Sequence, residues 1–104
     1  MAKTTITGAN WSSDYSSPVI PMEGVSGFSI QAKWTDSGSL GGTVSIQGSN
    51  DGVEFSPITG NTAVADSSSV LFEVKEPKFI WAKLFFEHSA GNGSADILIN
   101  TVPK

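Results

Sequence analysis

The side chains that could perform catalysis are few in this sequence, and they form no recognisable set. His88 is the only histidine among the 104 residues, and there is no cysteine. A cysteine nucleophile, a disulfide and a thiolate metal site are therefore excluded. Serine is abundant, so a Ser–His–acid triad stays open in principle, but the Gly-x-Ser-x-Gly elbow of many hydrolases is absent. We predict that the protein is not an enzyme and that His88 is a surface histidine at the end of a strand.

Carboxylates could bind calcium or hydrolyse a glycosidic bond if several of them converged. Most of the aspartates lie at expected turns instead, at Asp14, Asp36, Asp51 and Asp66. Aspartate at a turn accepts hydrogen bonds from nearby backbone N–H groups, which explains these residues without a ligand. Asn50 and Asp51 match no EF-hand spacing. We therefore expect no metal site and no cofactor, with calcium as the alternative.

Charge and hydropathy exclude two classes of partner. Six basic residues stand against ten acidic ones, which gives a formal charge of −4, and the lysines are scattered along a chain without arginine. A nucleic-acid partner is not expected, because phosphate binding needs a basic stripe or patch. No membrane partner is expected, because no run of about 18 apolar residues exists. Residues 1–5 also lack the apolar core of a signal peptide, so we expect synthesis inside the cell.

Alternation of apolar and polar residues predicts strands and no long helix. The predicted strands cover residues 25–34, 43–48, 53–58, 70–74, 79–87 and 95–102, with shorter ones near 4–7 and 19–22. Turn-forming sequences separate them at residues 36–42, 49–52, 59–69, 76–78 and 89–94. The last of these is expected to close a hairpin.

This pattern is typical of a single all-β domain over residues 1–104, an antiparallel two-layer β-sandwich of seven to eight strands. A jelly-roll-like and an Ig-like topology both fit, and residues 1–22 could form an extended N-terminal arm. The predicted core consists of inward-facing apolar side chains: Phe28, Ile30, Val44, Ile46, Phe72, Ile80, Leu84, Ile97 and Ile99.

Asn50, Asp51 and Gly52 form the strongest turn signal in the sequence. They follow Ser49 and precede the predicted strand that begins at Val53. Asn-Asp-Gly tolerates the positive φ that a tight hairpin requires. We predict a hairpin tip here, with positive φ at Gly52.

Aromatic residues are the remaining candidates for function, because exposed rings stack on sugars or anchor interfaces. Trp34 ends an alternating segment and is expected in the core. The segment 79–87 is apolar on both faces: Phe79, Trp81 and Phe85 alternate with Ile80, Ala82, Leu84 and Phe86. A strand that is apolar on both faces must be covered on both, and a two-layer sandwich covers only one.

The cover for the second face therefore comes from elsewhere. The interface that we predict consists of Phe79, Trp81 and Phe85, with Trp11 and Tyr15 from the N-terminal segment. Either another subunit covers this face, or residues 9–22 fold back over it.

Two segments resemble a pattern found in small β-sandwich structural proteins of bacteriophages. The first is Ser29-Ile30-Gln31-Ala32-Lys33-Trp34, and the second runs from Gly42 to Phe55 with Ser49-Asn50-Asp51-Gly52 as its turn. Together with the aromatic strand and the closing strand up to Lys104, the likeness covers residues 24–104.

The resemblance implies a virion component that is made in the host cytoplasm: a capsid decoration, vertex or fibre-associated protein. Such a protein would bind itself as a homo-oligomer, for example a trimer, and would dock on other virion proteins. A carbohydrate-binding module is the alternative function, with Trp11, Tyr15 or Trp81 as the platform for the sugar.

Overall fold

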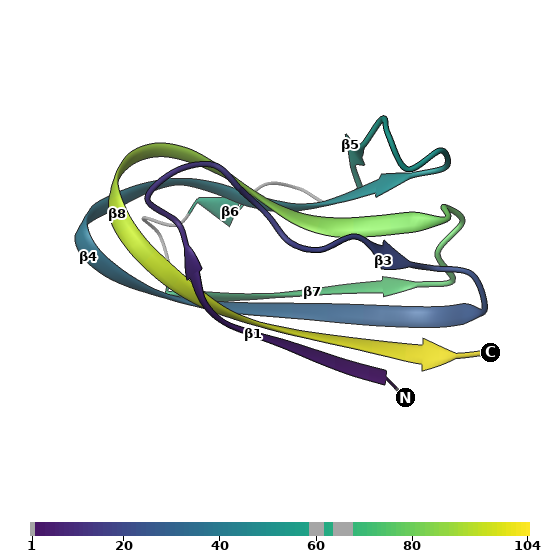
Figure 1. The fold of residues 1–104 in the computed structure, drawn as a ribbon. Helices are drawn as coiled ribbons and strands as arrows, with labels where there is room; N and C mark the ends of the chain where they lie inside the picture. The colour runs from purple at the N-terminus through teal and green to yellow at the C-terminus, as the bar shows by residue number, and fades with distance from the viewer. Residues whose placement is uncertain (1, 59–61, 64–67) are drawn as a thin grey trace.

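All the secondary structure in the described part of the chain is antiparallel β-sheet (Figure 1). The computed structural model describes residues 2–58, 62–63 and 68–104. Its strands are β1 (Ala2–Asn10), β2 (Tyr15–Ser16), β3 (Ile20–Pro21), β4 (Val25–Ser49), β5 (Ser56–Pro57), β6 (Thr62–Ala63), β7 (Ser69–Lys75) and β8 (Trp81–Pro103). The predicted all-β, antiparallel class is confirmed. No helix that could cross a membrane occurs among these residues.

Two long strands, β4 and β8, form the centre of the sheet. They pair antiparallel from Val25 opposite Pro103 to Ser49 opposite Trp81. Both bend in the middle and pass from one layer into the other, so the two layers are parts of one curled sheet (Figure 1). The loop predicted at residues 36–42 and the hairpin predicted at residues 89–94 are therefore wrong, because both are segments within a strand.

The bend coincides with glycine-rich sequence in both strands. Three of the four register shifts between β4 and β8 fall within residues 36–42 of β4, and the fourth lies between Val25 and Gly27. Gly42 has a φ of +148°, and an added Cβ would lie 2.7 Å from the Phe86 ring and would collide with the carbonyl oxygen of Glu87. Glycine and β-bulges allow a strand to turn sharply while its pairing continues. The same residues are common in loops, which is why the sequence predicted a loop here.

Each layer contains one half of β4 and one half of β8. In the lower layer of Figure 1, β1 pairs with the C-terminal half of β8, and β7 pairs with the N-terminal half of β4. In the upper layer, β2 and β3 pair with β8, while β5 and β6 pair with β4. The edges of the lower layer are thus β1 and β7.

The N-terminal segment is part of the sandwich and not an extended arm. Its strands β1, β2 and β3 all pair with β8. Between β1 and β2, Trp11 is fully buried and stacks on Phe86, with ring centroids 4.3 Å apart and an interplanar angle of 6°. The prediction that residues 1–22 extend from the body is wrong, because their apolar side chains close one side of the core.

The core lies between the two layers. Of the predicted core residues, those with less than 9% exposure are Phe28, Ile30, Val44, Ile46, Phe72, Leu84, Ile97 and Ile99. The prediction that Ile80 belongs to the core is wrong, since its side chain is 47% exposed. It lies before β8 begins, where the alternation of a strand does not apply. Phe79 turns inward instead and meets Phe28 edge-on, with ring centroids 6.2 Å apart.

Replacing Trp11 should show that the N-terminal segment is part of the core. We expect Trp11→Ala to lower the free energy of unfolding by about 3–5 kcal/mol, the usual cost of deleting a buried large aromatic side chain. Trp11→Phe should cost much less, because it keeps a ring on Phe86 and removes an indole N–H that has no acceptor among the described residues. Urea unfolding measures both.

The control is Val53→Ala, at a side chain that is 79% exposed, which should stay within about 0.5 kcal/mol of wild type. A Trp11→Ala variant as stable as this control would contradict the packing described here.

Candidate interaction surface

The predicted interface residues separate into two groups in the structure. Trp11 is fully buried, and Tyr15 and Phe79 pack partly buried against the core. These three side chains therefore contact their own chain, and Trp11 has no exposed ring for a sugar or a partner. Only Trp81 and Phe85 remain on an outer surface.

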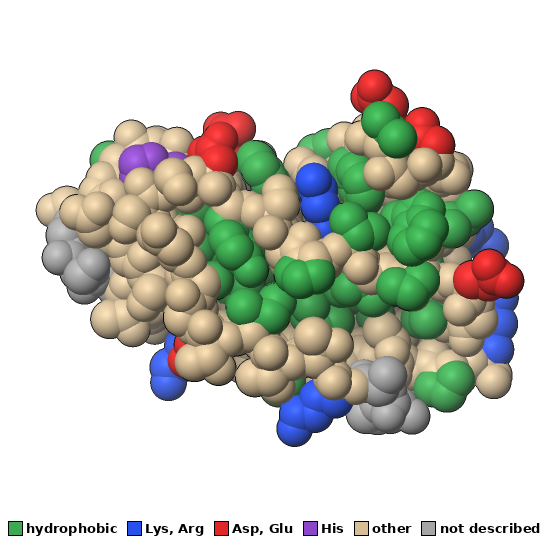
Figure 2. Space-filling view, viewed as in Figure 1, with side chains coloured by type: hydrophobic (Ala, Val, Ile, Leu, Met, Phe, Trp, Pro, Cys, Tyr) green, Lys and Arg blue, Asp and Glu red, His purple; other side chains and the backbone are tan. Residues whose placement is uncertain are grey.

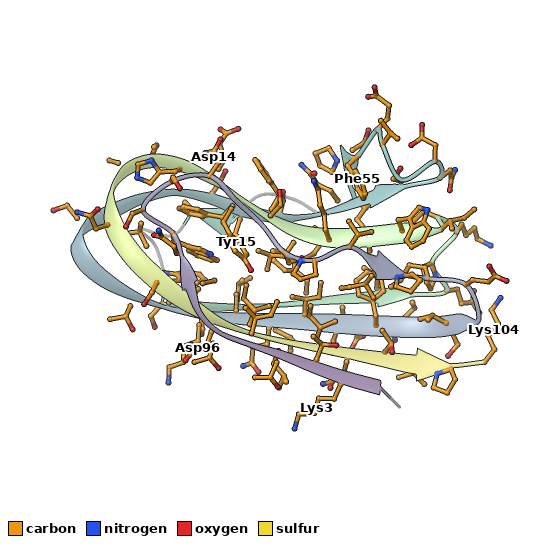
Figure 3. All side chains as sticks on the ribbon, in the orientation of Figure 1. Lys3, Asp14, Tyr15, Phe55, Asp96 and Lys104 are labelled. Carbon is orange, nitrogen blue, oxygen red and sulfur yellow. The ribbon has the colours of Figure 1, made fainter. Side chains whose placement is uncertain are left out.

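The alternation of β8 places Trp81 and Phe85 on the outer side of the upper layer. Ala82, Leu84 and Phe86 face the core and are fully buried, so the residues between them point outward. Trp81 and Phe85 are half-buried there, with Lys83 between them on the same side. Together with Phe55, which Figure 3 labels on the segment that follows β4, we call Trp81, Lys83 and Phe85 the aromatic face.

The neighbours of the aromatic face on β4 are small or polar. Ser45 lies opposite Phe85, Gln47 opposite Lys83, and Ser49 opposite Trp81. Ser45 and Ser49 are buried at 5% exposure, while Trp81 and Phe85 keep part of their surface accessible. Figure 2 shows hydrophobic side chains gathered where β8 begins and along the opening between the two layers.

Lys83 is held by rings and a hydroxyl group. Its Nζ lies 4.4 Å from the centre of the Phe55 ring and 5.9 Å from that of Phe85. It also lies 3.5 Å from the Ser16 Oγ. Within the described residues the one ion pair, Lys75 with Glu73 at 3.8 Å, lies elsewhere. The ammonium therefore makes cation–π contacts without a carboxylate partner.

A hydrogen-bonded turn positions Phe55. The Ser49 Oγ accepts bonds from the backbone N–H of Asp51 at 3.2 Å and of Gly52 at 2.9 Å. The Asp51 Oδ1 accepts bonds from the N–H of Val53 at 2.8 Å and of Glu54 at 2.9 Å, and from the Ser49 hydroxyl at 2.9 Å. Gly52 has a φ of +78°, as the turn prediction requires.

The turn is longer than expected, because β5 begins at Ser56 and not at Val53. The strand predicted at 53–58 is correspondingly reduced to two residues. The loop folds toward the aromatic face: a Cβ built on Gly52 would lie 3.3 Å from the Nε1 of Trp81.

The bonds to Asp51 also affect its ionisation. The backbone N–H groups of Val53 and Glu54, followed by the Ser49 hydroxyl, stabilise the carboxylate and lower the pKa of Asp51 below its ordinary value of 3.8. Asp51 thus acts as an ionised acceptor for the turn.

His88 and Asp14 have structural roles near the bend of β8. The Asp14 Oδ1 accepts a bond from the His88 backbone N–H at 2.8 Å, and the His88 Nε2 lies 2.8 Å from the carbonyl oxygen of Gly91. No group of three or more His, Asp or Glu side chains that could bind a metal occurs among the described residues. Asp66 and the side chain of Asp36, two of the aspartates considered in the sequence, lie outside the part of the chain that the structure describes.

Depressions in the surface lie away from the aromatic face. Two of them lie on the lower layer, one lined by Glu73, Lys75 and Asn100 among others, the other by Lys3, Lys33 and Asp96. A third lies among Ser26, residues 76–78 and Lys104. All are open, so they offer weak binding to small molecules in comparison with an enclosed pocket.

The fold is shared with solved structures, among them the following two. The SPBc2 prophage-derived protein YomS superposes with a TM-score of 0.57 at 11% identity, over 94% of this chain and 92% of that one. A protein described with the words "Bacillus endospore appendages form a novel family of disulfide-linked pili" superposes with a TM-score of 0.51 at 18% identity, over 97% of this chain and 86% of that one. At these identities the likeness establishes a common fold. No family model matches the chain, and no curated protein matches its sequence.

Sequence reasoning missed two members of the aromatic face. Lys83 lies midway between Trp81 and Phe85, so the same alternation places it on their side. This signal was available in the sequence. Phe55 reaches the face only because the turn at residues 49–54 folds back over β8, which no local pattern in the sequence shows.

A substitution at Gly52 should destabilise the turn. We expect Gly52→Val to lower the free energy of unfolding by about 1 kcal/mol or more, because a β-branched residue resists positive φ. Gly52→Asn should cost less than Gly52→Val, because asparagine tolerates this conformation and both variants place a Cβ 3.3 Å from the Nε1 of Trp81. Thermal unfolding of both variants measures the difference, and an equal melting temperature would show that the conformation of residue 52 does not limit stability.

The turn should weaken in acid. The pKa of Asp51 is lowered in the folded chain, so its contribution to stability is complete above its unfolded value and is lost as the pH falls through the folded one. The difference in melting temperature between wild type and Asp51→Asn should be constant above about pH 5 and shrink below about pH 4. Glu54→Gln is the control. It removes a carboxylate from the same turn but keeps the backbone N–H that residue 54 donates to Asp51. A difference that does not change with pH would contradict the role of the charge.

Proposed function

We propose that this chain is a structural component of a bacteriophage particle, a capsid decoration, vertex or fibre-associated protein. It works by binding copies of itself and docking on other virion proteins. The fold shared with a prophage-derived protein and with a protein of endospore appendages supports a role in assembly. The resemblance of residues 24–104 to phage structural proteins points the same way.

The observation that carries this proposal is the aromatic face. Trp81 and Phe85 stand on the outer side of the upper layer, and the N-terminal segment that could have covered them pairs beside β8 at its edge. Large aromatic side chains are typical of the centre of a protein interface. A face of this kind is suited to binding a macromolecule.

Contacts between copies of this sequence cannot be disulfides, because it has no cysteine. The appendage protein with the same fold is described as forming disulfide-linked pili. A chain without that link needs repetition: many weak contacts in a symmetric particle hold each copy more strongly than any single contact does.

A carbohydrate-binding module is the second candidate. Trp11 is fully buried, so a sugar would have to stack on Trp81 and Phe85. These residues are four positions apart on one strand, which separates them by about 13 Å. Gln47 and Lys83 between them could donate hydrogen bonds to hydroxyl groups.

Removal of Trp81 should dissociate the assembly. We expect the wild type to sediment above the monomer mass at high micromolar concentration, and Trp81→Ser to weaken self-association about tenfold or more, as the loss of a central aromatic does. Val102→Ser is the control, because it removes a 42% exposed apolar side chain from the lower layer. Analytical ultracentrifugation measures all three proteins.

A wild type that is strictly monomeric at these concentrations would overturn self-association as the mode of action. Binding of soluble oligosaccharides that is lost in Trp81→Ser would favour the carbohydrate candidate instead.

A further inference from the structure

The lower layer has two edges that no strand of the described chain covers. β1 pairs only with β8, and β7 pairs only with β4, in the part that the structure describes. Free edges present unpaired N–H and C=O groups and can pair with another chain, so monomeric proteins often protect them with proline, charged side chains, bulges or very short strands. β1 has a register irregularity only after Ile6, so its residues 3–6 pair regularly. β7 has seven residues and no proline.

The two edges carry opposite charges in one row, where a row means residues that lie directly opposite one another on the neighbouring strands β1, β8, β4 and β7. Lys3 is opposite Asn100, Asn100 is opposite Ser29, and Ser29 is opposite Glu73. The row therefore begins with an exposed lysine on β1 and ends with an exposed glutamate on β7. Figure 3 shows Lys3 pointing away from the lower layer.

The apolar rows continue in the same way. Ile6 on β1 and Val70 on β7 stand in one row with Ile97 and Ala32 between them. Both edge residues are only partly buried and pack against the core. A second copy placed beside the first would bring Ile6 of one against Val70 of the other and would extend the core across the joint.

Strand directions permit this joint. β1 is antiparallel to β8, β8 to β4, and β4 to β7, so β7 of one copy meets β1 of the next as an antiparallel pair. When the rows of the two copies are aligned, Lys3 of one copy lies opposite Glu73 of the other, and Thr5 lies opposite Leu71. The Leu71 side chain is 63% exposed. A shift by two residues would place Lys3 opposite Lys75 or Leu71, and a shift by one would turn the apolar side chains outward.

We propose that copies of this chain join by pairing β7 of one with β1 of the next, in the register that places Glu73 opposite Lys3. This inference rests on the proposed self-association and names a second surface for it, on the layer that does not carry the aromatic face. The joint uses different surfaces on its two sides, so it generates an open row or a ring and not a closed two-fold dimer. One pair of short strands buries little area, so assembly should depend on concentration.

A charge-swap cycle tests the pairing. Glu73→Lys and Lys3→Glu should each weaken self-association about fivefold, because like charges directly opposite one another destabilise a strand pair. The double variant should restore the wild-type affinity, since it reverses the pair. Glu23→Lys, at an exposed residue between β3 and β4, is the control for the net charge of Glu73→Lys and should have no effect. Sedimentation measures all five proteins, and failure of the double variant to recover would overturn the pairing.

Engineered cysteines provide a second test, because the chain has none of its own. Thr5→Cys with Leu71→Cys in one chain should form a ladder of disulfide-linked species under mild oxidation, since directly opposite residues in antiparallel strands are within disulfide range. Thr5→Cys with Lys75→Cys is the control: Lys75 is four residues from Leu71, about 13 Å along the strand, and should give no ladder.

The outcomes separate this inference from the proposed function. If the wild type self-associates but the double-cysteine variant forms no ladder and the charge variants have no effect, the strand joint is overturned and self-association through the aromatic face is left. A wild type that does not self-associate, together with a Thr5→Cys/Leu71→Cys variant that forms no ladder, would overturn both.

Discussion

The pairing of β4 with β8 is the interaction on which the rest of the structure depends. Each strand contributes one half to each layer, so a single ladder of backbone hydrogen bonds holds both sheets. The core lies between two halves of the same pair, and every other described strand is added to one of these two strands. A small domain without disulfides thus gains its order from one long antiparallel contact and the apolar surface that it encloses.

The same ladder determines which surfaces are free. In the upper layer it fixes the alternation that buries Leu84 and presents Trp81 and Phe85 on the outside. In the lower layer it fixes the rows that connect β1 to β7 and align Lys3 with Glu73. The aromatic face and the two strand edges therefore lie on different layers, and one chain can contact copies along its edges while the aromatic face binds a further copy or another protein.

Much of the fold could be predicted from local pattern. Segments such as 25–34 and 95–102 alternate with period two, and their inward side chains, Ile30 and Ile97 among them, are buried as expected. The bend could not be predicted, because glycine-rich sequence fits a loop and a bulged strand equally well. Choosing between them requires the long-range pairing of β4 with β8, which no local window contains.

The candidate site was predicted only in part, for the same reason. Alternation identified Trp81 and Phe85 as outward-facing. Trp11 has no periodic neighbours, so its position on Phe86 depends on how the N-terminal segment closes the sandwich. The opposite charges of Lys3 and Glu73 could not be related from the sequence either, since these residues are 70 positions apart. Three strand pairings must be known before the two residues can be placed in one row.

Hydrogen–deuterium exchange of the wild type at low and at high micromolar concentration tests the central claim, self-association through free edges, most directly. The account predicts slower exchange at residues 3–6 of β1 and 70–73 of β7 at the higher concentration, while the central half of the β4–β8 ladder stays equally protected at both. Exchange at both edges that is independent of concentration would contradict it.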